Sequence, residues 1–198
     1  MAASRMRWSG LGPAGPRLVG RGAARLAVAL GLAGVLAMAP SSHAGEPRTK
    51  VPAALELIPL DAQVRVPVPA EMAHERRSLG ARADLMTLSD GGDVLVVVVY
   101  RSSGQGAPPT AAEALETHAA ELAQALGAGA RATPQTQKLC GRERRGLRLE
   151  VEVGGRVRTG WVGAAEVKGR TIVASALWVA GSPNVALLER VAAGILVL

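Results

Sequence analysis

Histidine, serine, cysteine and clustered arginine are the side chains of this sequence that could do chemistry. His74-Glu75-Arg76-Arg77-Ser78 begins like the zinc motif H-E-x-x-H, but a serine stands where the second imidazole is needed. Zinc takes at least three protein ligands, and His74 and His118 are the only histidines after residue 44. The pattern therefore predicts an exposed helical turn at 71–77 rather than a metal site, and we expect no cofactor.

The usual pattern for nucleophilic catalysis is also missing from the sequence. No G-x-S-x-G motif surrounds Ser102, Ser103 or Ser175. An imidazole titrates near neutral pH, but His118 falls among leucines on a predicted helix, which favours a residue at the edge of the core over a catalytic base. We therefore expect a protein that is not an enzyme.

Cys140 is the only cysteine, so the chain forms no intramolecular disulfide. Arg142, Arg144 and Arg145 follow it closely and could lower the pKa of its thiol, which would raise its reactivity. The second cysteine that would resolve a mixed disulfide is missing. We expect a buried or inert thiol, with an intermolecular disulfide or a redox role as the alternatives.

A group of arginines falls in a stretch that the strand pattern places in a hairpin. These six are the candidate partner-binding residues: Arg142, Arg144, Arg145, Arg148, Arg156 and Arg158. Glu143, Glu150 and Glu152 interleave with them, which is typical of a solvated strand face with cross-strand ion pairs. The alternative is a surface for an anionic partner, such as a lipid head group or an acidic protein patch. We expect the six arginines to lie together at one end of the hairpin.

The first 44 residues have the layout of a secretory signal peptide. They hold five arginines and no acidic residue, then the apolar segment 26–39, then the small-residue site Ser42-His43-Ala44. The apolar segment has 14 residues, fewer than the about 20 that a transmembrane helix needs. We expect cleavage after Ala44, with a cut after Ala39, a start at Met1 or Met6, and retention of the segment as an anchor left open.

The basic charge of the chain belongs mostly to this leader. The formal net charge is +7, but five of the 23 Lys and Arg lie in the leader, which leaves 18 against all 16 Asp and Glu. The rest of the chain is near neutral and long enough for one domain. We expect a linker at 45–54 and a single domain at 55–198. Frequent Ala, Gly, Val, Arg and Leu suggest GC-rich codon usage and hence a high-GC bacterium.

Alternating and apolar runs predict a sheet. Valines alternate with other residues at 64–68, and the prolines there favour an edge or terminal strand. The segments 82–89 and 93–101 flank Asp90-Gly91-Gly92 and predict a hairpin. Val94–Tyr100 is apolar on both faces, which predicts a central strand covered on both sides. Further strand-like runs are 55–60, 147–153, 157–161 and 171–180.

Two helices accompany these strands. Thr110-Ala111-Ala112-Glu113 is a capping box that opens a helix with a leucine stripe, and Gly127 ends it. Ser182-Pro183 predicts the N-cap and first position of a C-terminal helix. The element order indicates an α+β domain: an antiparallel sheet of about six strands, a packed amphipathic helix and a C-terminal helix. We expect Trp161 and Trp178 in its core.

The turn near residue 155 decides how two of the strands pair. A two-residue Gly154-Gly155 turn would set Val153 opposite Arg156, whereas a three-residue turn sets it opposite Val157. Because register follows the buried face, we expect the three-residue turn.

The order of these elements is characteristic in itself. A first strand ends in proline at 64–69, and a hairpin, the amphipathic helix, Cys140-Gly141-Arg142-Glu143, a meander with a glycine turn and the tail 187–198 follow. In this order the chain resembles the Mog1/PsbP-like fold, which includes DcrB-type bacterial envelope proteins. The resemblance covers most of 55–198. It implies a domain that binds or assembles without catalysis, and it assigns no functional residue.

We therefore expect an exported, non-catalytic binding or assembly accessory protein of the bacterial cell envelope, periplasmic or extracellular after cleavage, with an envelope protein as partner. The near-zero charge after the leader and the 2% aromatic content argue against nucleic acid. One alternative is a small-molecule-binding domain or an unrecognised hydrolase, with His118 or an aspartate in a deep pocket. Another is a membrane-tethered module, since an uncleaved N-terminal segment is the one part expected to enter a membrane.

Overall fold

The computed structural model describes residues 54–198 except positions 91 and 105, so the predicted leader and nearly all of the predicted linker lie outside the described residues. The described chain forms β1 (Leu55–Pro59), β2 (Val64–Pro69), β3 (Ala73–Ser78), β4 (Ala83–Asp90), β5 (Asp93–Arg101), α2 (Ala111–Leu126), β6 (Arg131–Leu139), β7 (Arg142–Val153), β8 (Arg156–Val167), β9 (Arg170–Val179), α3 (Val185–Ala193) and β10 (Leu196–Val197). The predicted α+β class is confirmed: an antiparallel sheet carries a packed amphipathic helix, and a short helix follows near the C-terminus.

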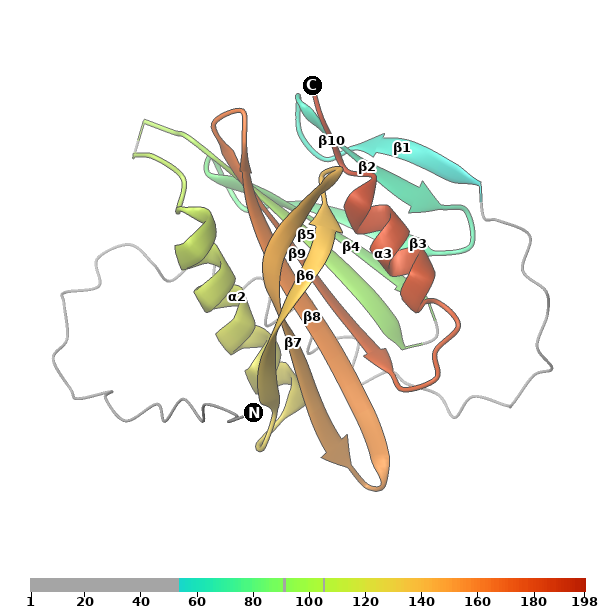
Figure 1. Cartoon of the computed structure of the whole chain (residues 1–198). Helices are drawn as coiled ribbons and strands as arrows, with labels where there is room; N and C mark the ends of the chain where they lie inside the picture. The colour runs from blue at the N-terminus through green and yellow to red at the C-terminus, as the bar shows by residue number, and fades with distance from the viewer. Residues whose placement is uncertain (1–53, 91, 105) are drawn as a thin grey trace, which may run out of the picture.

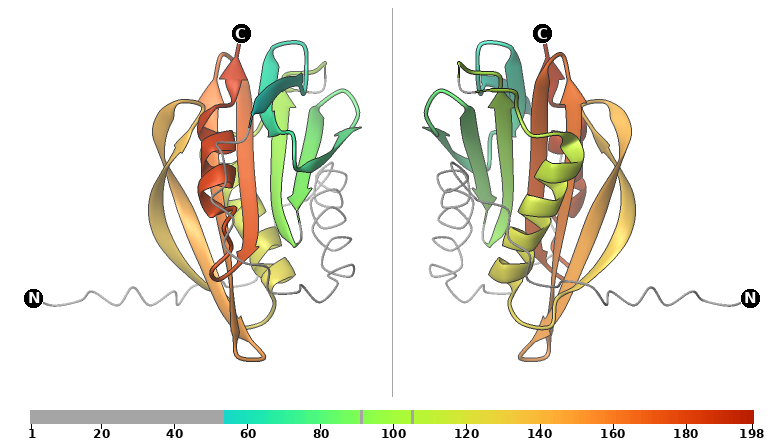
Figure 2. Two further views of the ribbon diagram at one scale, coloured as in Figure 1. Left: turned by 90° about the vertical axis from the view of Figure 1, so that its right-hand side faces the viewer. Right: turned by 90° about the vertical axis from the view of Figure 1, so that its left-hand side faces the viewer.

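The strands form two sheets. The large sheet has seven strands in the order β3-β4-β5-β9-β8-β7-β6, and all neighbours are antiparallel. The small sheet has the order β1-β2-β10. Helix α2 covers one face of the large sheet, while α3 and the small sheet lie over the other face (Figures 1 and 2). About six strands were predicted, and β3, β6 and β10 are those that the sequence did not indicate.

Strand β5 lies inside the large sheet, and its side chains belong to the apolar cores on both faces of that sheet. This is the arrangement that its two apolar faces predicted. Val96 and Val98 pack with Leu122 of α2. Leu95 and Val97 point the other way and pack in a second cluster with α3 and the small sheet. Burial on both faces explains why this strand lacks the alternating pattern of a half-exposed one.

Helix α2 begins and ends where the sequence predicted. The Glu113 backbone N–H donates to Thr110 Oγ1 at 3.3 Å, and the Thr110 N–H donates to the Glu113 carboxylate at 3.0 Å, which completes the capping box. Gly160 of β8 lets the helix approach the sheet closely, because a Cβ there would lie 2.9 Å from Leu122 Cδ2.

Two predictions about the N-terminal part are wrong. The segment 71–77 contains most of β3, an exposed edge strand paired with β4, instead of a helical turn. Strand β2 is the middle strand of the small sheet and not an edge. Its prolines are tolerated because β10 pairs only with Val64 and Arg65, so Pro67 and Pro69 lie beyond the end of β10.

The predicted three-residue turn is also wrong. Val153 pairs with Arg156 across a two-residue turn in which Gly154 and Gly155 have φ of 59° and 75°. Two consecutive positive φ angles define the turn type that suits a tight hairpin, and two glycines adopt it without strain. Register was expected to follow burial, but the end of this hairpin projects beyond the neighbouring strands and buries little (Figure 1).

The C-terminal helix starts later than predicted. Asn184 is the N-cap of α3, and Ser182 lies before the helix, where its hydroxyl accepts from the Asn184 N–H at 3.1 Å and donates to Asp93. Within residues 54–198, positions 91 and 105 aside, neither helix has the length and apolar character needed to cross a bilayer.

Candidate functional site

Five of the six candidate arginines form two groups at opposite ends of β7, and Arg148 lies between the groups. Arg142, Arg144 and Arg145 begin the strand next to the β6–β7 turn. Arg156 and Arg158 begin β8 beside the far end of β7. The strand between the two groups is roughly 30 Å long. The prediction of a single cluster is therefore wrong, because β7 is a twelve-residue strand that starts five residues before the predicted run.

The group near the start of β7 is partly engaged in the fold. Arg144 is half-buried, and its Nε–H is buried without a hydrogen-bond partner among the described residues. Arg148, further along the strand, forms an ion pair at 2.8 Å with Glu150 of the same strand, in place of the expected pair across strands.

The other group lies on the tip of the β7–β8 hairpin, and its surroundings are apolar. Val153 and Val157 are exposed there, as is Val179 of β9, which pairs with Arg158. Between 39% and 51% of each valine is accessible. Arg156 is exposed beside them. We call these five residues the hairpin tip; Figure 1 shows the β7–β8 turn that carries them extending at one end of the large sheet.

The tip carries one acidic neighbour. Glu152 is exposed and pairs with Val157 across the hairpin. Arg156 and Arg158 outnumber this one glutamate, so the net charge of the hairpin tip is positive. A positive surface is complementary to an acidic one.

Cys140 does not have the environment of an activated thiol. It lies in the β6–β7 turn with φ of 52°, and its backbone N–H donates to Ala192 at 3.2 Å. Burial raises the pKa of the thiol to about 11, and the nearby Arg144 lowers it only in part. The net effect on the pKa is opposite to the one that the neighbouring arginines suggested, so very little thiolate forms at neutral pH.

His118 lies in the core rather than at its edge. Only 1% of the residue is accessible, and Nε2 lies 2.8 Å from the Tyr100 hydroxyl. Nδ1 lies 3.6 Å from Glu121 Oε2. Burial lowers the pKa of His118 to about 4, so the ring is neutral at pH 7. Sequence reasoning missed Tyr100, although its place as the only tyrosine, at the end of the central strand, could have drawn attention to it.

His74 is exposed on β3. Among residues 54–198, with 91 and 105 left aside, no three or more histidine, cysteine, aspartate or glutamate side chains come together as metal ligands would.

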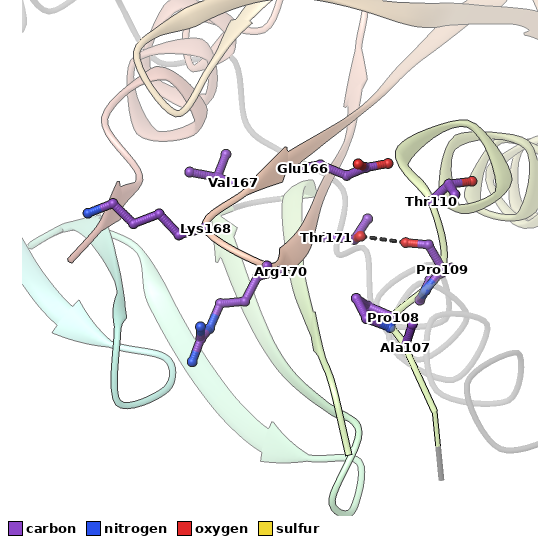
Figure 3. A pocket seen from close by; sticks show the side chains of 10 residues that line it. Ala107, Pro108, Pro109, Thr110, Glu166, Val167, Lys168, Arg170 and Thr171 are labelled. Carbon is purple, nitrogen blue, oxygen red and sulfur yellow. Dashed lines mark hydrogen bonds between the residues drawn. The ribbon is translucent and has the colours of Figure 1, made fainter. Parts of the chain in front are cut away.

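A shallow hollow of about 330 Å³ lies between the start of α2 and the β8–β9 turn (Figure 3). Its walls are residues 107–110 and 166–171, which include neither His118 nor an aspartate. Glu166 accepts from the Ala111 N–H at 2.7 Å, and the Thr171 hydroxyl donates to the Pro109 carbonyl. Lys168 extends away from residues 107–110. The polar groups of this hollow hold the helix to the turn, and it does not match the deep pocket that a small-molecule-binding domain was expected to have.

Trp161 and Trp178 are buried, as predicted. Trp161 lies over two glycines: a Cβ at Gly163 would lie 2.5 Å from its ring, and one at Gly146 would lie 2.9 Å from Nε1. Neither indole is therefore a surface anchor.

Comparison with known proteins finds similarity in chain path only. No family model matches the sequence, and no curated protein matches it. A protein from Bacteroides thetaiotaomicron is 11% identical, with a TM-score of 0.43 over 75% of this chain; the match spans about half of that protein, 49%. LpqN, described as involved in cell envelope biogenesis of Mycobacterium tuberculosis, is 15% identical, with a TM-score of 0.39 over 69% of this chain and 86% of its own.

Proposed function

We propose that this protein is an exported, non-catalytic accessory protein of the bacterial cell envelope that binds an envelope protein through its hairpin tip. The observation that supports this proposal is the exposure of Val153, Val179 and Arg156 on one face of a hairpin that extends past the rest of the sheet. Export is inferred from the arginine-rich leader, the apolar segment and the small-residue site at its end.

The tip has the features of an interaction surface. Valines exposed together bring little benefit to an isolated domain, but they release water when a partner covers them. Arginine offers planar, bidentate hydrogen bonds to carboxylates, and it is enriched at protein interfaces. The partner that fits is a protein with an acidic patch beside an apolar one.

The expected resemblance to Mog1/PsbP-like envelope domains is part of the proposal, since such domains act by binding. The hairpin tip supports the proposal; the distant similarity to LpqN does not carry it.

The test is affinity capture of the tagged full chain from a native envelope extract, followed by mass spectrometry. Arg156→Glu with Arg158→Glu reverses the charge of the tip, and Arg142→Glu with Arg145→Glu makes the same change at the other end of β7. We expect the first variant to lose a partner that the wild type and the second variant both retain. Equal capture by all three proteins, or loss in the second variant alone, would reject the tip as the binding surface.

A further inference from the structure

The outer face of the small sheet exposes leucines. Leu55 and Leu57 of β1, Leu196 of β10 and the following Leu198 are 36% to 55% accessible. The strand pairing places these side chains on one face of the small sheet. Arg65 of β2 is the partner of both Pro59 and Leu196, so these three residues share a face. Leu57 and Leu55 lie two and four residues before Pro59 in β1 and therefore share that face as well. On the other face of β1, Ile58 packs against the core and Glu56 is exposed. We call these four leucines the leucine face.

The charges around the leucine face are cationic. Arg65 is exposed in its centre, between β1 and β10. At its border, Arg76 of β3 donates to the Pro59 carbonyl at 3.4 Å. Neither arginine forms an ion pair with an acidic residue of the described chain.

The nearby acidic residues do not neutralise the leucine face. Glu56 alternates with Leu55 and Leu57 and so points to the opposite side of β1. Asp61 is engaged by Arg170, whose Nε lies 3.0 Å from its carboxylate. Asp61 also accepts from the Gln63 and Val64 N–H groups. Exposed leucines with a free arginine among them therefore define this surface.

We infer that the leucine face lies on an anionic lipid bilayer. Leucine side chains enter the boundary between head groups and acyl chains, and arginines above them contact lipid phosphates. A fluid bilayer adapts to the protein surface that rests on it, so the outer face of the small sheet needs no pocket or groove to bind it. A second copy of the chain fits less well, because a two-fold contact would set the arginines of one leucine face against those of the other.

This surface is separate from the hairpin tip. Arg170, at the start of β9, holds Asp61 beside the small sheet, whereas Val179, at the end of β9, belongs to the tip. The strand between them spans roughly 30 Å, and Figure 1 shows the small sheet and the hairpin tip at opposite ends of the molecule. A protein lying on the bilayer by its leucine face would point the tip away from the membrane.

The first test places a polarity-sensitive fluorophore on each surface of the full chain. In a Cys140→Ser background, Leu57→Cys or Val153→Cys carries the label, and vesicles of phosphatidylcholine with phosphatidylglycerol are added. We expect a blue shift, and quenching by brominated acyl chains, at position 57 but not at position 153. No change at position 57, or equal changes at both positions, would overturn the inference. This holds even if the leader alone binds the protein to the vesicles, because each label reports the surroundings of its own position.

The second test compares matched triple variants of the full chain. We expect Leu55→Ser, Leu57→Ser and Leu196→Ser together to lower partitioning into these vesicles about tenfold or more. Val153→Ser, Val157→Ser and Val179→Ser should leave it unchanged. Arg65→Glu should remove the preference over pure phosphatidylcholine vesicles.

Two results of this comparison would count against the bilayer. One is equal partitioning of both triple variants. The other is a wild-type dimer, seen in sedimentation without lipid, that the leucine variant abolishes, since this would assign the face to a second copy. If thermal unfolding shows that the leucine variant does not fold, the fluorophore experiment decides.

Discussion

The Tyr100 hydroxyl lies 2.8 Å from His118 Nε2, at a site from which solvent is almost excluded. The contact joins the end of β5 to the middle of α2, and the two rings meet edge to face with centroids 6.0 Å apart. Burial raises the pKa of Tyr100 above its ordinary value, and the nearby Glu121 adds to this effect. Both rings are neutral at pH 7, so the hydrogen bond fixes the helix on the sheet without burying a charge on either ring.

The low pKa of His118 predicts a loss of stability in mild acid. The pKa is about 4 in the folded chain against 6.5 as the ordinary value. Between these two pH values the unfolded histidine binds a proton and the folded one does not. As the pH is lowered through this window, the free energy of unfolding should therefore decrease, by up to about 1.4 kcal/mol per pH unit. Urea titrations from pH 7 to pH 4 measure this slope.

His118→Leu is the control for this effect, because leucine cannot titrate. The variant leaves the Tyr100 hydroxyl without its partner, so we expect it to be about 1–3 kcal/mol less stable at pH 7. Its stability should nevertheless fall less steeply than that of the wild type between pH 6.5 and pH 4. Parallel pH profiles for the two proteins would show that His118 does not titrate as described.

A second prediction concerns the close approach of α2 to β8. Gly160→Ala places a Cβ 2.9 Å from Leu122 Cδ2 and 3.2 Å from the Ala176 carbonyl, so we expect a destabilisation of roughly 1–3 kcal/mol. Gly104→Ala is the matched control, because no atom lies within 4 Å of that Cβ. Chemical denaturation measures both, and combining Gly160→Ala with Leu122→Ala should cost less than the sum of the two single changes.

A third prediction concerns the turn of the hairpin tip. Gly154 and Gly155 both have positive φ. Asparagine tolerates this region and valine does not. We expect Gly154→Asn to leave stability nearly unchanged and Gly155→Val to cost about 1–2 kcal/mol. Equal stability of both variants in thermal unfolding would contradict the two-residue turn.

A fourth prediction concerns the reactivity of Cys140. With a pKa of about 11, the folded thiol should react with iodoacetamide at pH 8 at least about tenfold more slowly than the same thiol in urea. Because Arg144 lowers this pKa, Arg144→Gln should slow the folded reaction further. Mass spectrometry of timed samples measures the rates, and a faster reaction in the variant would contradict the assignment.

The elements that the sequence predicted are those with two agreeing local patterns. The capping box at Thr110 and the leucine stripe together located α2, and the apolar runs on both sides of Asp90 located β4 and β5.

The strands that were missed carry no such pattern. In β3 (Ala73–Ser78) every residue is exposed, and in β6 (Arg131–Leu139) nearly all are polar or partly exposed. Both are edge strands, held by backbone pairing with one neighbour, and charged or proline-bearing edges of this kind protect a sheet from further pairing. Side-chain periodicity cannot reveal strands whose side chains are largely unburied.

The candidate arginines were found in sequence but not placed correctly. Their division depends on the length of β7 and on the turn at Gly154-Gly155, which set where each arginine falls along the hairpin. The leucine face could not be predicted at all, because it depends on β10 returning to pair with β2.

The pairing of β2 with β10 has a consequence for the order of folding. A chain made from its N-terminus cannot complete the small sheet until Leu196 and Val197 have emerged, and α3, which covers the same core, emerges just before them. Contacts between segments so far apart in sequence form late and slowly. The small sheet, and the core that it shares with α3, therefore form only after nearly all of the described chain is available.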